Sequence, residues 1–411
     1  MKKSALFVLG ASILTLASCG EKTNSTESNG GETTKTVKVA LVTDSGTLND
    51  HNFNQTSWEA VNAWAVENGG GTVKDQIVSN GSVLTKYYQP TAVGGDFTTT
   101  ERVAAIKAAA DWGANFIVLP GYLFQPVVKQ VQANAKYKDI HFLALDCVNQ
   151  DSDNKYAEYT LQKNVSMTQY HEEQAGFMAG YGAVKEGLTN LGFIGGMAVP
   201  AVVRYGYGYI QGAEKAATEL NLADNAIKMQ YYYAGAFAST TEATNFATSW
   251  YNAGTESIFA CGGAVYNSVT TALSGLSNKT GKTWIGVDTN QHADTSIKPE
   301  GTRELLLTSA MKGLGESIKS ALTDWKNNGY KKFSDKLAGK IENLGINEDA
   351  VALPTPETTG DADCWGFKKF TIDNYKTLVS QMKAGNITIS AATDAKPTVK
   401  KVQVTYNNAD N

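Results

Sequence analysis

The sequence contains little cysteine, histidine or proline. It has four cysteines, four histidines and eight prolines in 411 residues. No two histidines are spaced as H-x-x-x-H, and neither G-x-S-x-G nor G-x-G-x-x-G occurs. These patterns mark a zinc hydrolase, a serine hydrolase and a dinucleotide-binding turn, respectively. The sequence therefore gives no support to those three kinds of site.

Cysteine is also too scarce to build a disulfide framework. Cys19 lies near the start, which leaves Cys147, Cys261 and Cys364, an odd number without a C-x-x-C pair. We interpret these three as small buried apolar residues, although an oxidising location would permit one bridge. Charge is weak as well, with a formal net charge of −4. Nucleic-acid-binding proteins usually present a basic face, so we expect no nucleic-acid partner.

Long apolar runs are missing except at the start of the chain. Met1-Lys2-Lys3 precedes an apolar run from Ala5 to Leu16, which is short for a membrane span and typical of a secretory signal. Leu16-Ala-Ser-Cys19-Gly20 resembles a bacterial lipobox, which implies cleavage before Cys19 and attachment of diacylglycerol to its sulfur. A plain signal peptide with an incidental cysteine is the alternative. Residues 1–18 are thus a predicted signal peptide, and 19–36 a lipidated cysteine with a disordered polar tether on the outer face of the cell membrane.

The rest of the chain is organised around its first strand, loop and helix. Residues 37–43 form a β-branched apolar run typical of a buried parallel strand, and the run ends on Asp44. Turn residues follow as far as Asp50, after which Phe53, Trp58 and Val61 recur at helical spacing. Ligands of open α/β sheets bind beyond the carboxyl ends of the strands. The loop from Asp44 to Asn54 is therefore a candidate wall of a ligand site.

The same alternation of strand and helix continues, which predicts an α/β protein with parallel sheets covered by helices on both faces. About 375 residues follow the tether, enough for two Rossmann-like, doubly wound lobes joined by a hinge. We expect residues 37–148 plus about 311–335 in the first lobe and 149–310 plus about 336–405 in the second, with crossovers near 147–150, near 309–312 and after 330. Small or acidic residues end seven predicted strands and would line one cleft: Asp44, Gly121, Asp146, Gly195-Gly196, Gly262-Gly263, Asp288 and Ser309.

Several motifs in this order resemble the basic membrane protein family of nucleoside-binding lipoproteins. These proteins are the substrate-binding components of ABC importers and have the type I periplasmic-binding-protein fold. The resemblance covers about residues 37–330 and rests on six motifs: Val-Thr-Asp44-Ser-Gly-x-x-Asn-Asp50-x-x-Phe53-Asn54-Gln, Gly192-Phe-Ile-Gly195-Gly-Met197, Gly235-Ala-Phe237, Gly262-Gly263, Ile-Gly-Val-Asp288 and Leu-Thr-Ser309-x-x-Lys312.

The resemblance implies a nucleoside, with a purine favoured, held between the lobes. Phe53 and Phe237 correspond to aromatics that sandwich the base, and Asp288 to a carboxylate that accepts hydrogen bonds from the ribose hydroxyls. Further contacts would come from Asn49, Asp50, Asp146, Lys312, Gly262 and Gly263. Most of these residues have an ordinary alternative. The aromatics could be core residues, Asp50 a helix cap, and Asp288 a helix N-cap or a member of a hinge salt bridge. Lys312 could pair with Asp288 or be a solvated lysine at a helix start, and the glycines could form tight turns.

The chain also departs from the family pattern at Asn290, where a second acid is usual, and at Ala236-Phe237-Ala238-Ser239 and Ala264-Val-Tyr266-Asn267. A sugar or signal molecule bound by a sensor lipoprotein of the same fold is therefore an alternative, and a nucleoside hydrolase is a weaker one. The expected partners are an adenosine, guanosine or inosine type ligand, an ABC permease, and the membrane through the lipid anchor. We expect a non-enzymatic monomer without cofactor or metal, whose lobes close around the ligand.

Overall fold

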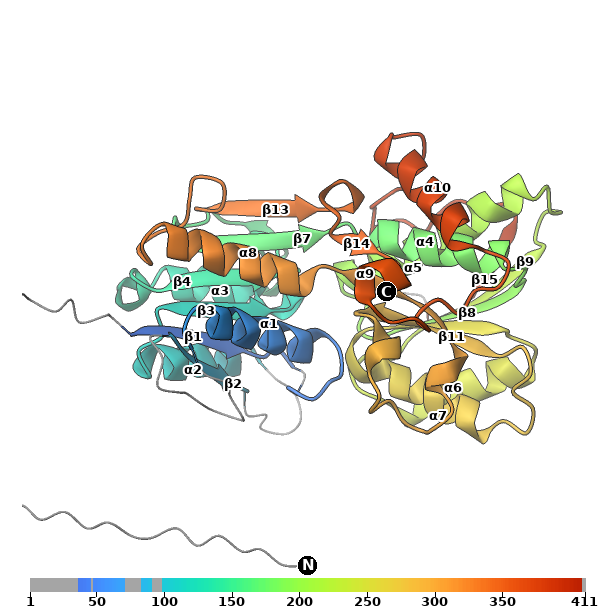
Figure 1. Ribbon diagram of the computed structural model, residues 1–411, viewed down its shortest axis with the longest axis horizontal. Helices are drawn as coiled ribbons and strands as arrows, with labels where there is room; N and C mark the ends of the chain where they lie inside the picture. Colours follow the sequence, from blue (N-terminus) through green and yellow to red (C-terminus); the bar gives the residue numbers. More distant parts are fainter. Residues whose placement is uncertain (1–35, 46, 71–82, 91–97, 409–411) are drawn as a thin grey trace, which may run out of the picture. The chain divides into compact units, whose positions relative to one another are not determined.

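The computed structural model describes residues 36–45, 47–70, 83–90 and 98–408 (Figure 1). The signal-peptide, Cys19-lipidation and tether predictions lie outside these residues, apart from the single residue Thr36. Among the described residues, no helix is long and apolar enough to cross a membrane. All three cysteines in these ranges are buried and free of disulfides, which confirms their interpretation as apolar core residues.

The first lobe is built on a parallel sheet of six strands in the order β13-β7-β4-β3-β1-β2. The strands are β1 (Val37–Val42), β2 (Val83–Tyr88), β3 (Phe116–Pro120), β4 (His141–Leu145), β7 (Val165–Tyr170) and β13 (Lys340–Leu344). Helices α1 (Phe53–Glu67) and α8 (Leu314–Asn327) share one apolar cluster with Val39 and Leu41 of β1. Helices α2 (Thr99–Asp111) and α3 (Gln125–Gln132) share another with the alternate residues Ala40 and Val42. Helices therefore cover both faces, as a doubly wound sheet requires.

The second lobe is built on a sheet of seven strands in the order β14-β12-β11-β10-β8-β9-β15. Its strands are β8 (Asn190–Gly195), β9 (Ile227–Tyr233), β10 (Ser257–Cys261), β11 (Thr283–Asp288), β12 (Leu306–Lys312), the antiparallel β14 (Val351–Ala352) and β15 (Val402–Tyr406). Helices α4 (Glu172–Lys185) and α5 (Pro200–Glu219) pack on one face, and α6 (Thr241–Asn252) and α7 (Tyr266–Gly275) on the other. The predicted fold class, two doubly wound α/β lobes, is confirmed.

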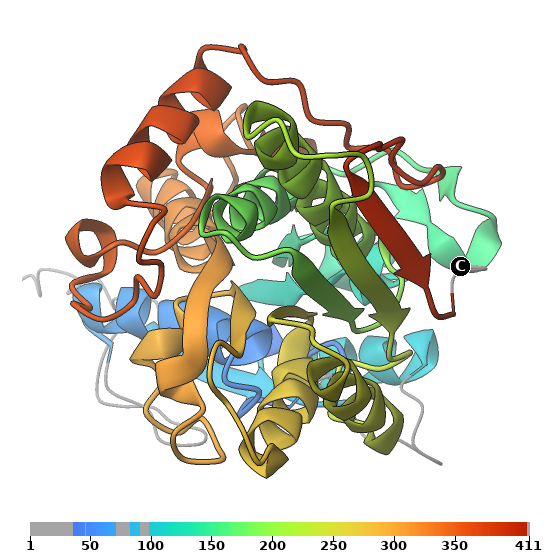
Figure 2. The same cartoon turned by 90° about the vertical axis from the view of Figure 1, so that its right-hand side faces the viewer.

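Smaller elements complete the two lobes. Strands β5 (Gln150–Asp151) and β6 (Ala157–Glu158) form a short hairpin beside the first sheet. Helices α9 (Pro356–Thr359) and α10 (Ile372–Lys383) precede β15, which pairs in parallel with β9 at the edge of the second sheet (Figure 2). Residues 331–408 thus contribute β13 to the first sheet and β14 and β15 to the second.

The two lobes repeat the same turn geometry at their strand ends. Gly121 after β3 and Gly262 after β10 have φ values of +123° and +125°, which favour glycine, and each precedes a short 3₁₀ turn, η1 (Tyr122–Phe124) or η4 (Gly263–Val265). Asp146 after β4 and Asp288 at the end of β11 are both left-handed, with φ of +55° and +64°. Non-glycine residues seldom adopt this conformation, and those that do are often found at functional sites. Its recurrence in both lobes therefore makes these two strand ends candidates for a functional site.

Sheet membership corrects the expected lobe boundaries. Strand β7 pairs with β4, and β13 pairs with β7, so residues 149–170 and 340–344 belong to the first lobe (Figure 1). The first crossover therefore follows Tyr170 instead of lying near 147–150, the second lies at Gly313, and the third lies between β13 and β14. The expected boundary was wrong because Val165–Tyr170, V-S-M-T-Q-Y, contains three polar residues and lacks the continuous apolar run of the other strands. It is buried by the neighbouring strands and by the helices on both faces of the sheet.

The three crossovers lie together and are hydrogen-bonded to one another. The His171 amide donates to the Leu344 carbonyl at 2.9 Å, and the Gly313 amide donates to the Ala350 carbonyl at 2.8 Å. Helices α4 and α5 approach each other closely through glycines that include Gly176 and Gly180. A Cβ at Gly180 would lie 2.1 Å from the Tyr209 carbonyl oxygen. Backbone therefore packs on backbone between these two helices of the second lobe.

Candidate ligand-binding site

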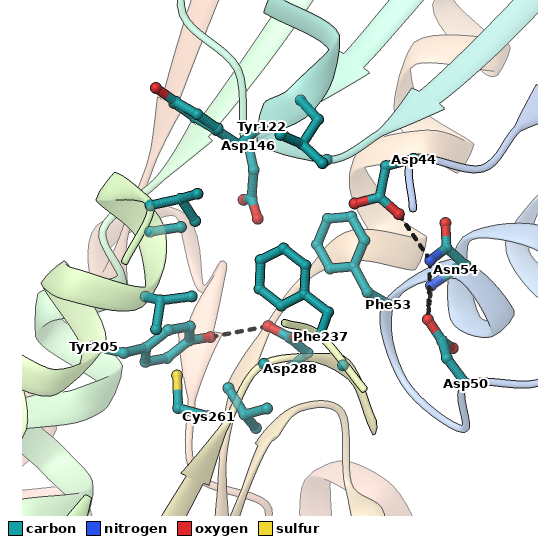
Figure 3. Close-up of a pocket in the computed structure, with 18 of the residues that line it drawn as sticks. Asp44, Asp50, Phe53, Asn54, Tyr122, Asp146, Tyr205, Phe237, Cys261 and Asp288 are labelled. Atoms are coloured by element: carbon teal, nitrogen blue, oxygen red, sulfur yellow. Dashed lines mark hydrogen bonds between the residues drawn. The ribbon is translucent and has the colours of Figure 1, made fainter. Parts of the chain in front are cut away.

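One pocket lies between the carboxyl ends of the two sheets and encloses about 640 Å³, counted with its opening to solvent. Both lobes contribute to its wall (Figure 3). The lining residues are Asp44, Asp50, Phe53, Asn54, Gly121, Tyr122, Leu123, Asp146, Val199, Ala201, Val202, Tyr205, Phe237, Cys261, Gly262, Gly263, Val287, Asp288 and Lys312.

The pocket brings together every predicted ligand-contact residue except Asn49. Asn49 is exposed, because the loop before α1 turns its neighbour Asp50 inward instead. Two of the predicted strand ends also lie outside the lining. Gly196 makes room for the ring of Phe237, and Ser309 Oγ accepts a hydrogen bond from the Gln291 amide at 3.2 Å. Both residues therefore contact residues next to the pocket without lining it themselves.

Two aromatic rings enter the pocket from opposite lobes (Figure 3). Phe53 is the first residue of α1 and is 8 % exposed, whereas Phe237 is partly buried in the loop between β9 and α6. A Cβ at Gly263 would lie 2.8 Å from the Phe237 carbonyl oxygen, and one at Gly196 would lie 2.6 Å from its ring. In this structure the glycines therefore seat Phe237, which is a more specific role than a tight turn.

Buried charges gather around Lys312 at the end of β12. Its Nζ atom lies 2.5 Å from Asp146 Oδ2 and 3.2 Å from Asp288 Oδ1, so one ammonium group joins carboxylates from both lobes. Glu172 Oε1 lies 3.8 Å from the same nitrogen, and the other oxygen of Glu172 pairs with Arg204 Nε at 2.6 Å. The cluster thus contains two cations and three carboxylates. It carries an excess of negative charge in a buried place.

Burial shifts the pKa values of the cluster, and the neighbouring charges modify them. Burial raises the pKa of Asp146 to about 7 even though Lys312 lowers it, and burial likewise raises the pKa of Asp288. Burial alone would lower the pKa of Lys312, but the surrounding carboxylates hold that pKa above its ordinary value, so the lysine stays charged. Asp146 Oδ1 is buried without a hydrogen-bond partner among the described residues. This oxygen can accept a hydrogen bond from a hydroxyl group of a ligand.

A second polar wall lies beside the first strand. Asp50 accepts hydrogen bonds from the backbone amides of Asn52, Asn54 and Gln55 at 2.9, 2.9 and 3.1 Å, which is the capping role considered for it above. The side-chain amide of Asn54 donates to Asp50 and, at 3.2 Å, to Asp44 (Figure 3). Asn54 Oδ1 is buried and unpartnered among the described residues. Asn54 thus offers an acceptor to N–H groups of a ligand.

Sequence reasoning missed the residues that support Lys312. Glu172 begins α4 and Arg204 lies in α5, and neither lines the pocket. A signal existed for Arg204, a single charge within an otherwise apolar or small stretch, because a buried charge requires a partner. Glu172 stands among the polar residues His171, Glu173 and Gln174 and gave no such signal. Tyr205 was also missed; its hydroxyl donates to Asp288 Oδ1 at 3.4 Å.

Comparison with known proteins identifies the family. Residues 37–377 match the family model Bmp, described as ABC transporter substrate-binding protein PnrA-like. The chain belongs to this family. Bmp proteins are substrate-binding components of ABC transporters, so this chain acts outside the cytoplasm, with a ligand and a permease as its partners. The family identified from the six motifs is confirmed, and the match extends beyond residue 330, where the expected resemblance ended.

Individual relatives are similar over most of their length. The chain is 27% identical to the ABC transporter nucleoside-binding protein BmpA of Lactococcus lactis subsp. cremoris, covering 88% of this chain and 94% of that one. It is 26% identical to basic membrane protein A1 of Borrelia garinii subsp. bavariensis, covering 86% and 88%. An ABC transporter solute-binding protein from Aeropyrum pernix K1 superposes with a TM-score of 0.64 at 18% identity, covering 87% and 94%. This last likeness shows the same two-lobe fold.

Proposed function

We propose that this Bmp protein captures a nucleoside, with a purine favoured, between its lobes and delivers it to an ABC importer. One observation carries the proposal: the aromatic pair Phe53 and Phe237 and the charged group of Asp146, Asp288 and Lys312 share a single pocket. A nucleoside has a flat base at one end and a hydroxyl-bearing sugar at the other. The two halves of the pocket match these two chemistries. The name of the Lactococcus relative, which is called nucleoside-binding, agrees with this.

The base is proposed to lie between the two phenylalanines. Aromatic side chains stack on any planar heterocycle, with about 1–3 kcal/mol per stacked base. Purines offer the larger face. The edge of the base then meets Asn54 and Asp44, whose oxygens can accept hydrogen bonds from ring or amino N–H groups. Stacking supplies affinity, and this polar wall supplies orientation.

The sugar is proposed to lie against the charged cluster. Asp146 and Asp288 can each accept a hydrogen bond from a ribose hydroxyl, and Lys312 can donate one. Because these carboxylates come from opposite lobes, a diol that reaches both favours the closed arrangement. Four acids and one lysine line the pocket, so a phosphate group would be repelled. The proposed ligand is therefore an uncharged nucleoside in preference to a nucleotide.

The proposal includes the anchor inferred from the sequence. Cys19 would carry the lipid, and residues 19–36 would tether the binding lobes to the outer face of the cell membrane. Asn290, the departure that favoured a sugar or signal ligand, does not line the pocket. Its side chain donates to Asp361 at 3.0 Å. That departure therefore does not argue against a nucleoside.

Calorimetric titration tests the proposal. The chain expressed without residues 1–18 and with Cys19→Ser would be titrated with adenosine, guanosine, inosine, uridine, AMP, adenine and ribose, followed by chromatography of the ligand. We expect tight binding of purine nucleosides, weak binding of AMP, adenine and ribose, and unchanged ligand. Binding of ribose as tight as that of inosine would favour the sugar alternative, and release of free base would favour the hydrolase. Failure of every nucleoside to bind would refute the proposal.

A further inference from the structure

A contact between the lobes lies beside the pocket without lining it. His51, from the loop before α1 in the first lobe, places Nδ1 2.9 Å from Ser296 Oγ and 3.0 Å from Asp294 Oδ2 of the second lobe. Ser296 Oγ also donates to Asp294 Oδ1 at 2.5 Å. The side chains of His51 and Asp294 are 32% and 21% exposed, so the contact is partly shielded from water.

The acceptor side of this contact depends on His51. Asp294 Oδ2 is buried and has no hydrogen-bond partner of good geometry among the described residues. The His51 imidazole faces this oxygen, with Nδ1 3.0 Å away. Separating the lobes would expose both groups to water, whereas removing His51 alone would leave a poorly solvated carboxylate oxygen in the closed arrangement.

Both halves of the contact belong to segments that also hold the pocket. His51 lies between Asp50 and Phe53, and its amide donates to Gln55 Oε1 at 3.2 Å. A second bond between the lobes comes from the same loop, because Asn52 Nδ2 donates to the Gly263 carbonyl at 3.2 Å. Movement of this loop would therefore disturb the interlobe contacts and the Phe53 wall together.

The segment that carries Asp294 is held in place by further contacts within the second lobe. Asp294 follows η5 (Gln291–Ala293), which begins three residues after Asp288. In this turn, His292 Nδ1 lies 2.8 Å from Asp361 Oδ2 of the C-terminal segment. Gln291 Oε1 accepts from the Val287 amide at 2.9 Å. Asp288 in the pocket and Asp294 at the interlobe contact are thus carried on one fixed segment.

We propose that His51, Asp294 and Ser296 form a clasp that holds the lobes closed and slows release of the ligand. The proposal rests on the proposed function for its ligand, but the clasp is already formed between protein groups alone. Contacts that exist only when the lobes meet shift the population toward the closed state by their own interaction free energy. A partly exposed polar contact between side chains is modest, so we expect the clasp to slow release by about two- to fivefold.

A double-mutant cycle tests the clasp. His51→Ala, Asp294→Ala and the double variant would be made in the Cys19→Ser chain, with Asp111→Ala as a control because Asp111 pairs with Lys107 on α2, outside this contact. Dissociation of inosine would be followed by stopped-flow fluorescence. Each clasp variant should release inosine about two- to fivefold faster, and the double variant no faster than either single one. Unchanged release in the single variants, or multiplied effects in the double one, would overturn the proposal.

A measurement without ligand keeps the clasp separate from the nucleoside proposal. Spin labels at Lys136→Cys and Lys279→Cys, exposed residues of the first and second lobes, report the distance between the lobes. In the ligand-free chain, His51→Ala and Asp294→Ala should shift the distribution toward the separated lobes, and Asp111→Ala should not. An unchanged distribution would refute the clasp even if inosine binds. A shift in a chain that binds no nucleoside would support the clasp and refute the nucleoside.

Discussion

Ligand affinity should depend on pH through Asp146. Burial raises the pKa of this carboxyl from its ordinary 3.8 to about 7 in the ligand-free protein, in spite of Lys312. Below about pH 7, the folded protein therefore holds a proton that an unfolded chain would have lost. The stabilisation from this proton is fully present below about pH 4 and is lost as the pH rises through about 7. Asp288 shifts in the same direction.

A bound nucleoside should favour the ionised form of Asp146 over the protonated form. A ribose hydroxyl that donates to Asp146 favours the ionised carboxylate, so binding below about pH 7 must release a proton. At pH 6, about one tenth of a group with a pKa of about 7 is ionised, against about nine tenths at pH 8. We therefore expect the affinity for inosine to be about tenfold weaker at pH 6 than at pH 8, which corresponds to about 1.4 kcal/mol.

Calorimetry measures both consequences. Titration with inosine at pH 6, 7 and 8, in buffers with small and large ionisation enthalpies, gives the affinity and the number of protons released. Asp146→Asn removes the titrating group and should weaken binding at pH 8 while flattening the pH dependence. Asp111→Asn, on exposed α2, is the matched control and should keep it. An affinity independent of pH in the unsubstituted protein, without proton release, would refute the assignment of Asp146 as a buried, shifted ligand contact.

Three further predictions concern stacking, charge and packing. Phe237→Ala should weaken inosine binding by about 5- to 150-fold in calorimetry, because one stacked aromatic contributes about 1–3 kcal/mol, and a loss within error would refute the base sandwich. Lys312→Met leaves buried carboxylates unpaired and should lower the free energy of unfolding by about 3–5 kcal/mol in urea denaturation at pH 8; an unchanged midpoint would contradict the pairing of buried charges at Lys312. Gly180→Ala should lower that free energy by at least about 3 kcal/mol, because its Cβ would meet the Tyr209 carbonyl oxygen at 2.1 Å. Gly275→Ala meets nothing within 4 Å and is the control for it, and equal stability of the two variants would contradict the close helix packing.

Much of the fold and the pocket could be predicted because the relevant information is local. The run Val37–Val42 is apolar at every position except Lys38, which indicates a strand buried on both faces, and Phe53, Trp58 and Val61 repeat at helical spacing. Parallel strands also bring their carboxyl ends to one edge, so Asp44, Asp146 and Asp288 could be gathered without coordinates. Asn49 shows the limit of this reasoning, since one residue in a turn decides which side chain faces inward.

Pairing between distant segments could not be predicted. The strand Val165–Tyr170 carries polar letters and was assigned to the wrong lobe, because only its partners β4 and β13 make it a strand of the first sheet. Lys340–Leu344 gives no clue that it returns to a lobe whose other strands end near residue 170. Which edge of which sheet a segment joins is a long-range choice, and its free energy comes from neighbours that the local sequence does not contain.

The sequence by itself therefore determined the kind of protein: an α/β chain in two lobes, with acids, glycines and aromatics at the strand ends. The tertiary structure decided how those groups act. It placed one lysine between carboxylates of both lobes, turned Asp50 into a helix cap, seated Phe237 on glycines and set His51 against Asp294. The reason is physical, since periodicity depends on neighbours along the chain, whereas burial, charge pairing and pKa depend on neighbours in space.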